Sequence, residues 1–163
     1  MVDLAELQNR YGSELTASTF RDNHRLVVPC EKIYEVLSGL KQDFGFDQLI
    51  DITAVDYLEY PDAEHRFGVV YLLLSVSTGE RLIVKTFVDL PKPELPTIYS
   101  LWKGANWMER EVYDMFGIVF SGHPDLRRIL LPDEFASFPL RKDYPLQGRG
   151  ERHNFPVITR AES

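Results

Sequence analysis

The residues that could support chemistry gather in one stretch, MEREVYDMFGIVFSGHPDLRRIL, at residues 108–130. Glu111 and Asp114 are three positions apart, a spacing that brings two side chains together on one face of a helix. With His123 they could act as metal ligands or as an acid–base pair. However, Arg110 lies beside Glu111 and four positions before Asp114, so a metal ion would have to displace a counter-charge already in place.

Stronger signatures of catalysis or of metal binding do not occur in the sequence. Its one cysteine, Cys30, cannot supply the set of thiolates that usually holds an iron–sulfur cluster. There is no nucleophile elbow, no phosphate-binding loop, no pair of histidines at helical spacing and no GxGxxG after a strand. We therefore expect no catalytic residue, metal ligand or cofactor-binding residue here. A small metal-dependent hydrolase centred on Glu111, Asp114 and His123 is the alternative from another class.

Composition narrows the class of protein further. The chain has 163 residues, of which 44% are hydrophobic, enough for one domain with a real core. A formal net charge of −7 disfavours nucleic acid or an anionic membrane surface as the main partner. A single cysteine suits a reducing compartment. Without an apolar signal core, and with its longest apolar run at residues 69–74, the sequence predicts a bacterial cytoplasmic chain.

Hydrophobic periodicity predicts the elements that must position these residues. Apolar side chains recur at helical spacing over residues 4–11 and 33–44, and a brief strand is expected at residues 26–28. Ile50, Ile52 and Ala54 alternate with polar residues as in a strand, and FGVVYLLLSV and RLIVKTFV, separated by STGE, predict a hairpin. The unbroken apolar character of FGVVYLLLSV suggests a strand covered on both faces. The predicted fold is α+β, with a mixed, largely antiparallel sheet packed with helices.

Two helices are expected around the start of the motif. TIYSLWKG predicts a short one, and Asn106 is the expected N-cap of the next. Glu109 stands three residues after Asn106, in the position of a capping box. Arg110 is expected to pair with Asp114 one turn further on. These expected contacts would explain Glu109 and Arg110 by a role in helix stability, without a role in catalysis.

Beyond His123 the sequence becomes rich in proline and loses its periodicity. Alone, such a segment could not bury enough surface to offset the entropy lost on ordering. We therefore expect a compact domain at residues 1–123 and an extended partner-docking tail at residues 124–163, with disorder as the alternative from Gly148 onward. Two basic pairs favour an interface over solvated charges: Arg127 with Arg128, and Arg141 with Lys142. The expected apolar anchors of the tail are Phe138, Leu140, Tyr144 and Phe155.

The motif residues also carry a family resemblance. Glu109, Arg110, Glu111, Asp114, Met115, Phe116, His123, Arg127, Ile129 and Leu130 reproduce a signature in both type and spacing. In them the chain resembles the 30 kDa subunit of respiratory complex I, the bacterial proton-translocating NADH:quinone oxidoreductase. The resemblance continues through WKGANW before the motif and FPLRKDYP after it. It covers nearly the whole chain.

The resemblance implies a structural subunit in the hydrophilic arm of that enzyme, supporting electron transfer from NADH to quinone coupled to proton translocation. Such a subunit carries no cofactor itself, and FMN, iron–sulfur clusters and quinone belong to partner subunits. It implies docking on the 49 kDa-type subunit, among the other hydrophilic-arm subunits, at the cytoplasmic face of the bacterial inner membrane. Ferredoxin:plastoquinone oxidoreductases and membrane-bound hydrogenases contain equivalent subunits and are the alternatives. The motif and interface residues are Glu109, Arg110, Glu111, Asp114, His123, Arg127, Arg128, Phe138, Leu140, Arg141, Lys142, Asp143 and Tyr144.

Overall fold

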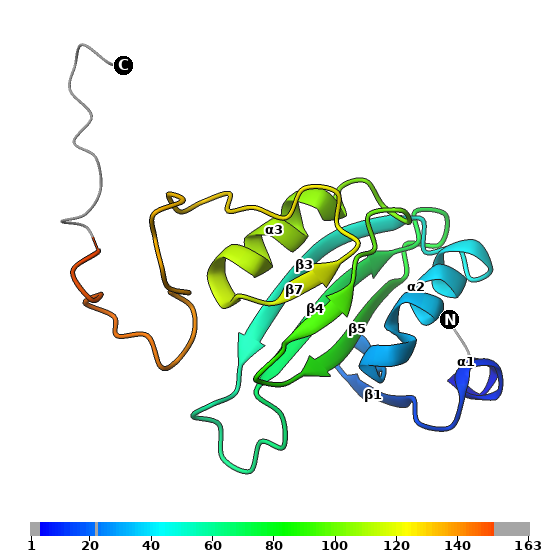
Figure 1. The fold of residues 1–163 in the computed structure, drawn as a ribbon. Coiled ribbons are helices and arrows are strands. Elements are labelled where there is room, and N and C mark those ends of the chain that lie inside the picture. Colours follow the sequence, from blue (N-terminus) through cyan, green and yellow to red (C-terminus); the bar gives the residue numbers. More distant parts are fainter. Residues whose placement is uncertain (1–3, 22, 152–163) are drawn as a thin grey trace.

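The computed structural model describes residues 4–21 and 23–151, and Figure 1 shows the arrangement of its elements. Phe155, one of the predicted tail anchors, lies outside these residues. The elements in chain order are α1 (Leu4–Tyr11), β1 (Thr16–Phe20), β2 (Asn23–Val27), a 3-10 turn η1 (Cys30–Lys32), α2 (Ile33–Gln42), β3 (Gln48–Asp56), β4 (Phe67–Leu74), β5 (Arg81–Val88), β6 (Glu94–Pro96), α3 (Ala105–Phe116) and β7 (Val119–Ser121).

Five strands form one sheet in the order β1-β2-β5-β4-β3. Neighbouring strands run antiparallel except β2 and β5, which are parallel. The hairpin predicted around STGE joins β4 to β5, closed by the Ser75 N–H donating to the Glu80 carbonyl at 2.9 Å. Helices α1 and α2 also form where periodicity predicted them. The predicted α+β fold with a mixed, largely antiparallel sheet is therefore confirmed.

The core lies against one face of this sheet. Along β5, Leu82, Val84 and Val88 are buried, whereas the intervening Ile83 and Phe87 are half-buried. The buried face joins one cluster with apolar residues of α1, α2 and α3. Because all three helices pack toward that cluster, the opposite face has no helical cover among the described residues. The expectation that FGVVYLLLSV is covered on both faces is therefore wrong, since its alternate residues are only half-buried.

Local irregularities account for the other departures from the predicted elements. The register of β3 with β4 shifts between Leu49 and Asp51, and this bulge leaves Ile50 exposed beside buried Ile52. The segment TIYSLWKG forms turns and not the predicted short helix. Strand β1 was not predicted because all of its side chains are exposed and show no apolar alternation.

Helix α3 packs beside β3 and is followed by β7, as Figure 1 shows. Strand β7 pairs in parallel with β6 in a separate two-stranded sheet. Gly117 ends α3 with a left-handed φ of 72°, and its N–H donates to the Tyr113 carbonyl. This sharp end lets the chain return along the helix, so residues 127–131 come to lie beside α3.

Candidate functional site

Helix α3 carries the charged motif, and it begins differently from the prediction. Its N-cap is Gly104, which makes no side-chain capping bond, and Asn106 lies inside the helix. The predicted capping box of Asn106 and Glu109 is therefore wrong. Because the helix starts two residues earlier, Glu109 lies beyond its first turn and faces the core with none of its surface exposed.

Glu109 binds the connection between β6 and α3. The Thr97 hydroxyl donates to one carboxylate oxygen at 2.5 Å, and the Ile98 N–H donates to the other at 2.7 Å. Burial removes the carboxylate from water and raises its pKa from the ordinary 4.5 to about 7, a shift that these two hydrogen bonds oppose only in part. Glu109 is thus a buried group that can take up a proton near neutral pH.

His123 approaches the Glu109 oxygen that accepts from Thr97, with 3.7 Å between His123 Nε2 and Glu109 Oε2. Its Nδ1 lies 3.0 Å from the Asp125 N–H and accepts a hydrogen bond from it, so the imidazole proton must sit on Nε2. Nε2 then donates to the Asn106 carbonyl at 3.2 Å. Burial lowers the pKa of His123. The ring is therefore a neutral link between α3 and the turn after β7.

Asp114 is fully buried and holds the returning chain against α3. One carboxylate oxygen accepts from Arg128 Nη1 at 2.6 Å. The other accepts from three successive backbone N–H groups, those of residues 129–131, at 2.7 to 3.0 Å. Burial acts to raise its pKa, but these four donors together hold it below the ordinary value. Asp114 is therefore an ionised anchor with no oxygen free for a metal ion.

Arg110 binds backbone carbonyls and not the carboxylate predicted for it. Its guanidinium donates to the carbonyls of Arg127 at 3.0 Å and Arg128 at 2.8 Å. The predicted Arg110–Asp114 ion pair is wrong, because the returning chain supplies Asp114 with Arg128 as its counter-charge. Since a guanidinium has donors in a planar fork, Arg110 can hold two adjacent carbonyls at once.

Arg141 and Phe138 fasten the next part of the tail at the end of α3. The Arg141 guanidinium donates to the Phe116 carbonyl at 2.5 Å and lies over the ring of Phe138 at 4.6 Å. The Phe138 ring packs so close to Gly117 that an added Cβ would lie 2.5 Å from it. The Leu140 N–H donates to the Met115 carbonyl. Arg141 thus replaces the missing intrahelical donor of a terminal carbonyl.

A second anchor ties the tail to the end of β3. The Lys142 N–H donates to Asp56 at 2.8 Å, and Arg66 contacts both Asp56 at 2.9 Å and Asp143 at 3.1 Å. Lys142 makes this contact through its backbone N–H and not through its side chain. Asp56 and Arg66 were not identified as functional residues from the sequence. In the sequence Asp56 is an ordinary polar residue at the end of a predicted strand, so no motif or spacing distinguishes it.

The remaining predicted residues make looser contacts. Arg127 is exposed and pairs with Asp125 at 2.9 Å, and the Tyr144 ring lies 5.9 Å from that of Phe135. Glu111 is exposed, although it is only three residues from buried Asp114. The structure does not unite Glu111, Asp114 and His123, because Asp114 is occupied by the tail and His123 faces Glu109. No group of three potential metal-ligating residues occurs within residues 4–21 and 23–151.

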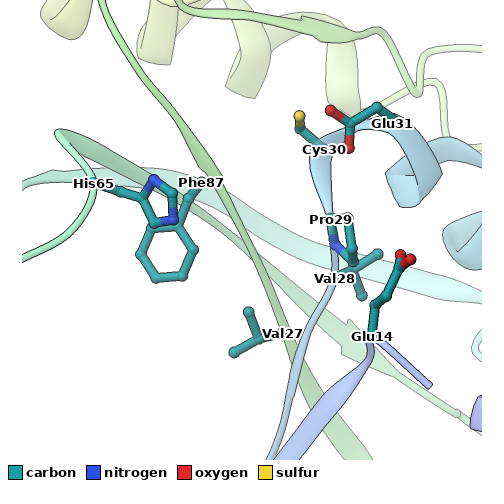
Figure 2. A pocket seen from close by; sticks show the side chains of 8 residues that line it. All are labelled: Glu14, Val27, Val28, Pro29, Cys30, Glu31, His65 and Phe87. Atoms are coloured by element: carbon teal, nitrogen blue, oxygen red, sulfur yellow. The ribbon is translucent and has the colours of Figure 1, made fainter. Parts of the chain in front are cut away.

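The surface pockets that lie away from this motif include the following two. One has a volume of about 460 Å³ and is bordered by Tyr57, Lys85 and residues of the loop between β3 and β4. The other has about 330 Å³, and Figure 2 shows His65 beside Phe87 across from Cys30 and Glu31. The residues lining the second are Glu14, Val27, Val28, Pro29, Cys30, Glu31, His65 and Phe87. Neither pocket contains a residue that the sequence singled out for function.

The geometry defines a class of protein: a small α+β domain whose buried charged residues hold its own C-terminal segment on its surface. Residues 26–150 match the model of the family described as respiratory-chain NADH dehydrogenase, 30 Kd subunit. The chain belongs to this family, as the motif residues predicted. No helix in the described part of the chain is long and apolar enough to span a bilayer.

Curated relatives carry names consistent with this family. Over 138 residues the chain is 46% identical to an NADH-quinone oxidoreductase subunit from Geobacter metallireducens, covering 85% of this chain and 84% of the relative. It is 50% identical over 127 residues to NADH-quinone oxidoreductase subunit 5 of Thermus thermophilus, covering 74% of this chain and 61% of that protein. Both relatives are thus named as subunits of NADH-quinone oxidoreductase.

Solved structures show the same fold. A trypsin-resistant fragment of Nqo5 superposes with a TM-score of 0.69 at 42% identity, covering 76% of this chain and 96% of the fragment. A chain of a membrane-bound sulfane sulfur reductase, an archaeal respiratory membrane complex, gives a TM-score of 0.76 at 27% identity. That match covers 96% of this chain and 91% of the other.

Proposed function

We propose that this chain is a non-catalytic structural subunit of the peripheral arm of an NADH:quinone oxidoreductase. Family membership over residues 26–150 carries the proposal. The burial of the motif supports a structural role, because Glu109, Arg110 and Asp114 are engaged in contacts within the chain. The chemistry of electron transfer would then reside in partner subunits that hold FMN, iron–sulfur clusters and quinone, and this chain would hold none.

The proposed partner is the 49 kDa-type subunit, and the proposed docking element is the tail at residues 124–163. Leu130, Leu140 and Leu146 are exposed along the described part of the tail. Exposed apolar side chains on an extended segment are suited to insertion into a partner's surface. Through this partner the chain would lie at the cytoplasmic face of the inner membrane and support the coupling of electron transfer to proton translocation.

Affinity purification of the tagged full chain from its host tests this function. We expect cluster-bearing subunits and NADH:quinone activity to copurify with it, whereas the separately expressed chain should contain neither flavin nor iron. Stoichiometric iron or flavin on the isolated chain would contradict the non-catalytic role. Isolation of the chain without any redox partner would contradict membership of the peripheral arm.

A chain ending at Pro132 tests the docking element. The helices and strands from α1 to β7 all end before this point, so we expect the truncated chain to give a folded circular dichroism spectrum. Its melting temperature should fall, because the bonds from Arg141 and Lys142 are lost. It should bind the 49 kDa-type partner more weakly than the full chain does. Retention of that partner at the wild-type level would falsify the docking role of the tail.

A parent complex with a different electron donor is the second candidate. The similarity to a chain of the sulfane sulfur reductase complex supports it, since that match covers 96% of this chain. The names of the curated relatives favour NADH. Assaying the purified complex with NADH and with reduced ferredoxin would discriminate, because a ferredoxin-linked complex should reduce quinone with the second donor alone.

A further inference from the structure

Helix α3 exposes a tryptophan whose ring is held in place. Trp107 has 60% of its surface exposed, although it belongs to the same helix as the buried motif. The Arg110 guanidinium lies 5.5 Å from its ring centre, and two backbone carbonyls fix that guanidinium in turn. A cation over the ring restricts the motion of an otherwise free side chain. An exposed aromatic group that is already oriented loses little entropy when a partner covers it.

One turn further along α3, Glu111 is an exposed acid without an internal partner. Within the described residues it makes no hydrogen bond or ion pair, whereas Glu109 and Asp114 are both satisfied by the fold. Trp107 and Glu111 are four residues apart, so their side chains are neighbours on the helix. The surface therefore offers an indole ring beside an unpaired carboxylate.

The tail extends this surface. The backbone of residues 127–131 runs beside α3, bound first by Arg110 and then by Asp114. Leu130 belongs to this run, and 62% of its surface is exposed. A docking surface formed by Trp107, Glu111 and Leu130 would therefore be continuous with the tail of the proposed function.

We propose that Trp107, Glu111 and Leu130 form the central contact with the partner subunit, which presents an apolar pocket for the indole and an arginine or lysine for Glu111. This inference rests on the proposed function. Charge complementarity selects a basic group, because Glu111 has no counter-charge among the residues that the structure describes. Tryptophan and partnered charges dominate the binding energy of many interfaces, while the surrounding contacts contribute little.

Association of the full chain with its purified partner tests the surface through Trp107→Ala and Glu111→Gln. We expect each variant to bind more weakly, with a dissociation constant raised about tenfold or more. Their melting temperatures should match wild type, because both side chains are exposed. Glu111→Gln should also reduce the dependence of binding on salt, because it removes one charge pair. Leu58→Ala and Glu59→Gln, at exposed positions of the loop between β3 and β4, are matched controls and should bind as wild type does.

Failure of this surface is distinguishable from failure of the proposed function. If wild-type protein captures redox subunits and both α3 variants bind them as tightly as wild type does, the surface is refuted while the function stands. If wild-type protein captures no redox subunit, the function itself fails. Should Trp107→Ala lower the melting temperature as well as binding, the isosteric Glu111→Gln decides, and unchanged binding by that variant overturns the proposal.

Discussion

Replacing Glu109 with glutamine should remove a fall in stability that the wild-type protein shows as pH rises towards neutrality. Glutamine has nearly the same shape and keeps an oxygen that can accept from the Ile98 N–H, but it cannot ionise. In the wild-type fold, burial raises the pKa of Glu109 from 4.5 to about 7. The folded state therefore holds a proton on this carboxyl at pH values where the unfolded chain has already released it.

The sign and size of the effect follow from this difference. A raised pKa in the folded state means that the free energy of unfolding falls as pH rises from 4.5 to about 7 and then levels off. At 1.36 kcal/mol for each pH unit, the full loss is about 3 kcal/mol. Glu109→Gln removes this loss. Relative to wild type, the variant should therefore gain about 3 kcal/mol between pH 4.5 and pH 8.

Urea unfolding of wild type and Glu109→Gln at a series of pH values between 4.5 and 8 measures this gain. His123, whose pKa is lowered by burial, acts in the opposite direction below its ordinary 6.5, but it is present in both proteins and largely cancels in the difference. Thr97→Val is a useful control, since it removes one hydrogen bond to Glu109 and leaves the carboxyl in place. A difference between variant and wild type that does not change with pH would refute the reasoning, because Glu109 would then keep an ordinary pKa in the fold.

Other substitutions test the anchors of the tail. Asp114→Asn should lower the free energy of unfolding by about 3 kcal/mol, because Arg128 loses its buried partner. Urea unfolding should show this loss shrinking as pH falls below 3.8, because Asp114 of the unfolded wild-type chain then takes up a proton before Asp114 of the folded state does. Gly117→Ala should cost about 2 kcal/mol and speed proteolysis of the tail, because the φ of 72° disfavours a side chain that would also collide with Phe138. In thermal melts, Arg141→Ala should be destabilising by about 2 kcal/mol, since it frees the Phe116 carbonyl and uncovers two rings. Lys142→Ala should change stability by less than about 0.5 kcal/mol, because its hydrogen bond to Asp56 uses the backbone alone; equal effects of the last two variants would contradict these assignments.

Sequence patterns predicted the elements whose apolar residues repeat regularly. Helix α2 and the β4–β5 hairpin formed as expected, since helical spacing and alternation describe how a segment faces a core. The patterns failed in strands whose side chains do not alternate regularly between a buried and an exposed face. Strand β1 has no buried face to reveal it, and Ile50 is displaced by a bulge that depends on pairing with β4.

The partners of the charged motif could not be predicted in the same way. Asp114 pairs with Arg128, 14 residues further along the chain, and Glu109 bonds to Thr97, 12 residues earlier. Helical spacing instead suggested Arg110 and Asn106 as partners, because it considers only neighbours on one helix. The irregular segments that supply the observed partners have no periodicity from which their course could be derived.

By itself, therefore, the sequence determined the fold class, the family and the position of the charged stretch on a helix, because these depend on local periodicity and on residue spacing. The tertiary structure decided which charges are buried, which pKa values shift and which side chains remain for a partner. The physical reason is that a carboxylate's environment depends on segments brought to it from elsewhere. Glu109, Glu111 and Asp114 occur within six residues on one helix, yet one is buried without a close counter-charge, one is exposed and one is clamped by the tail.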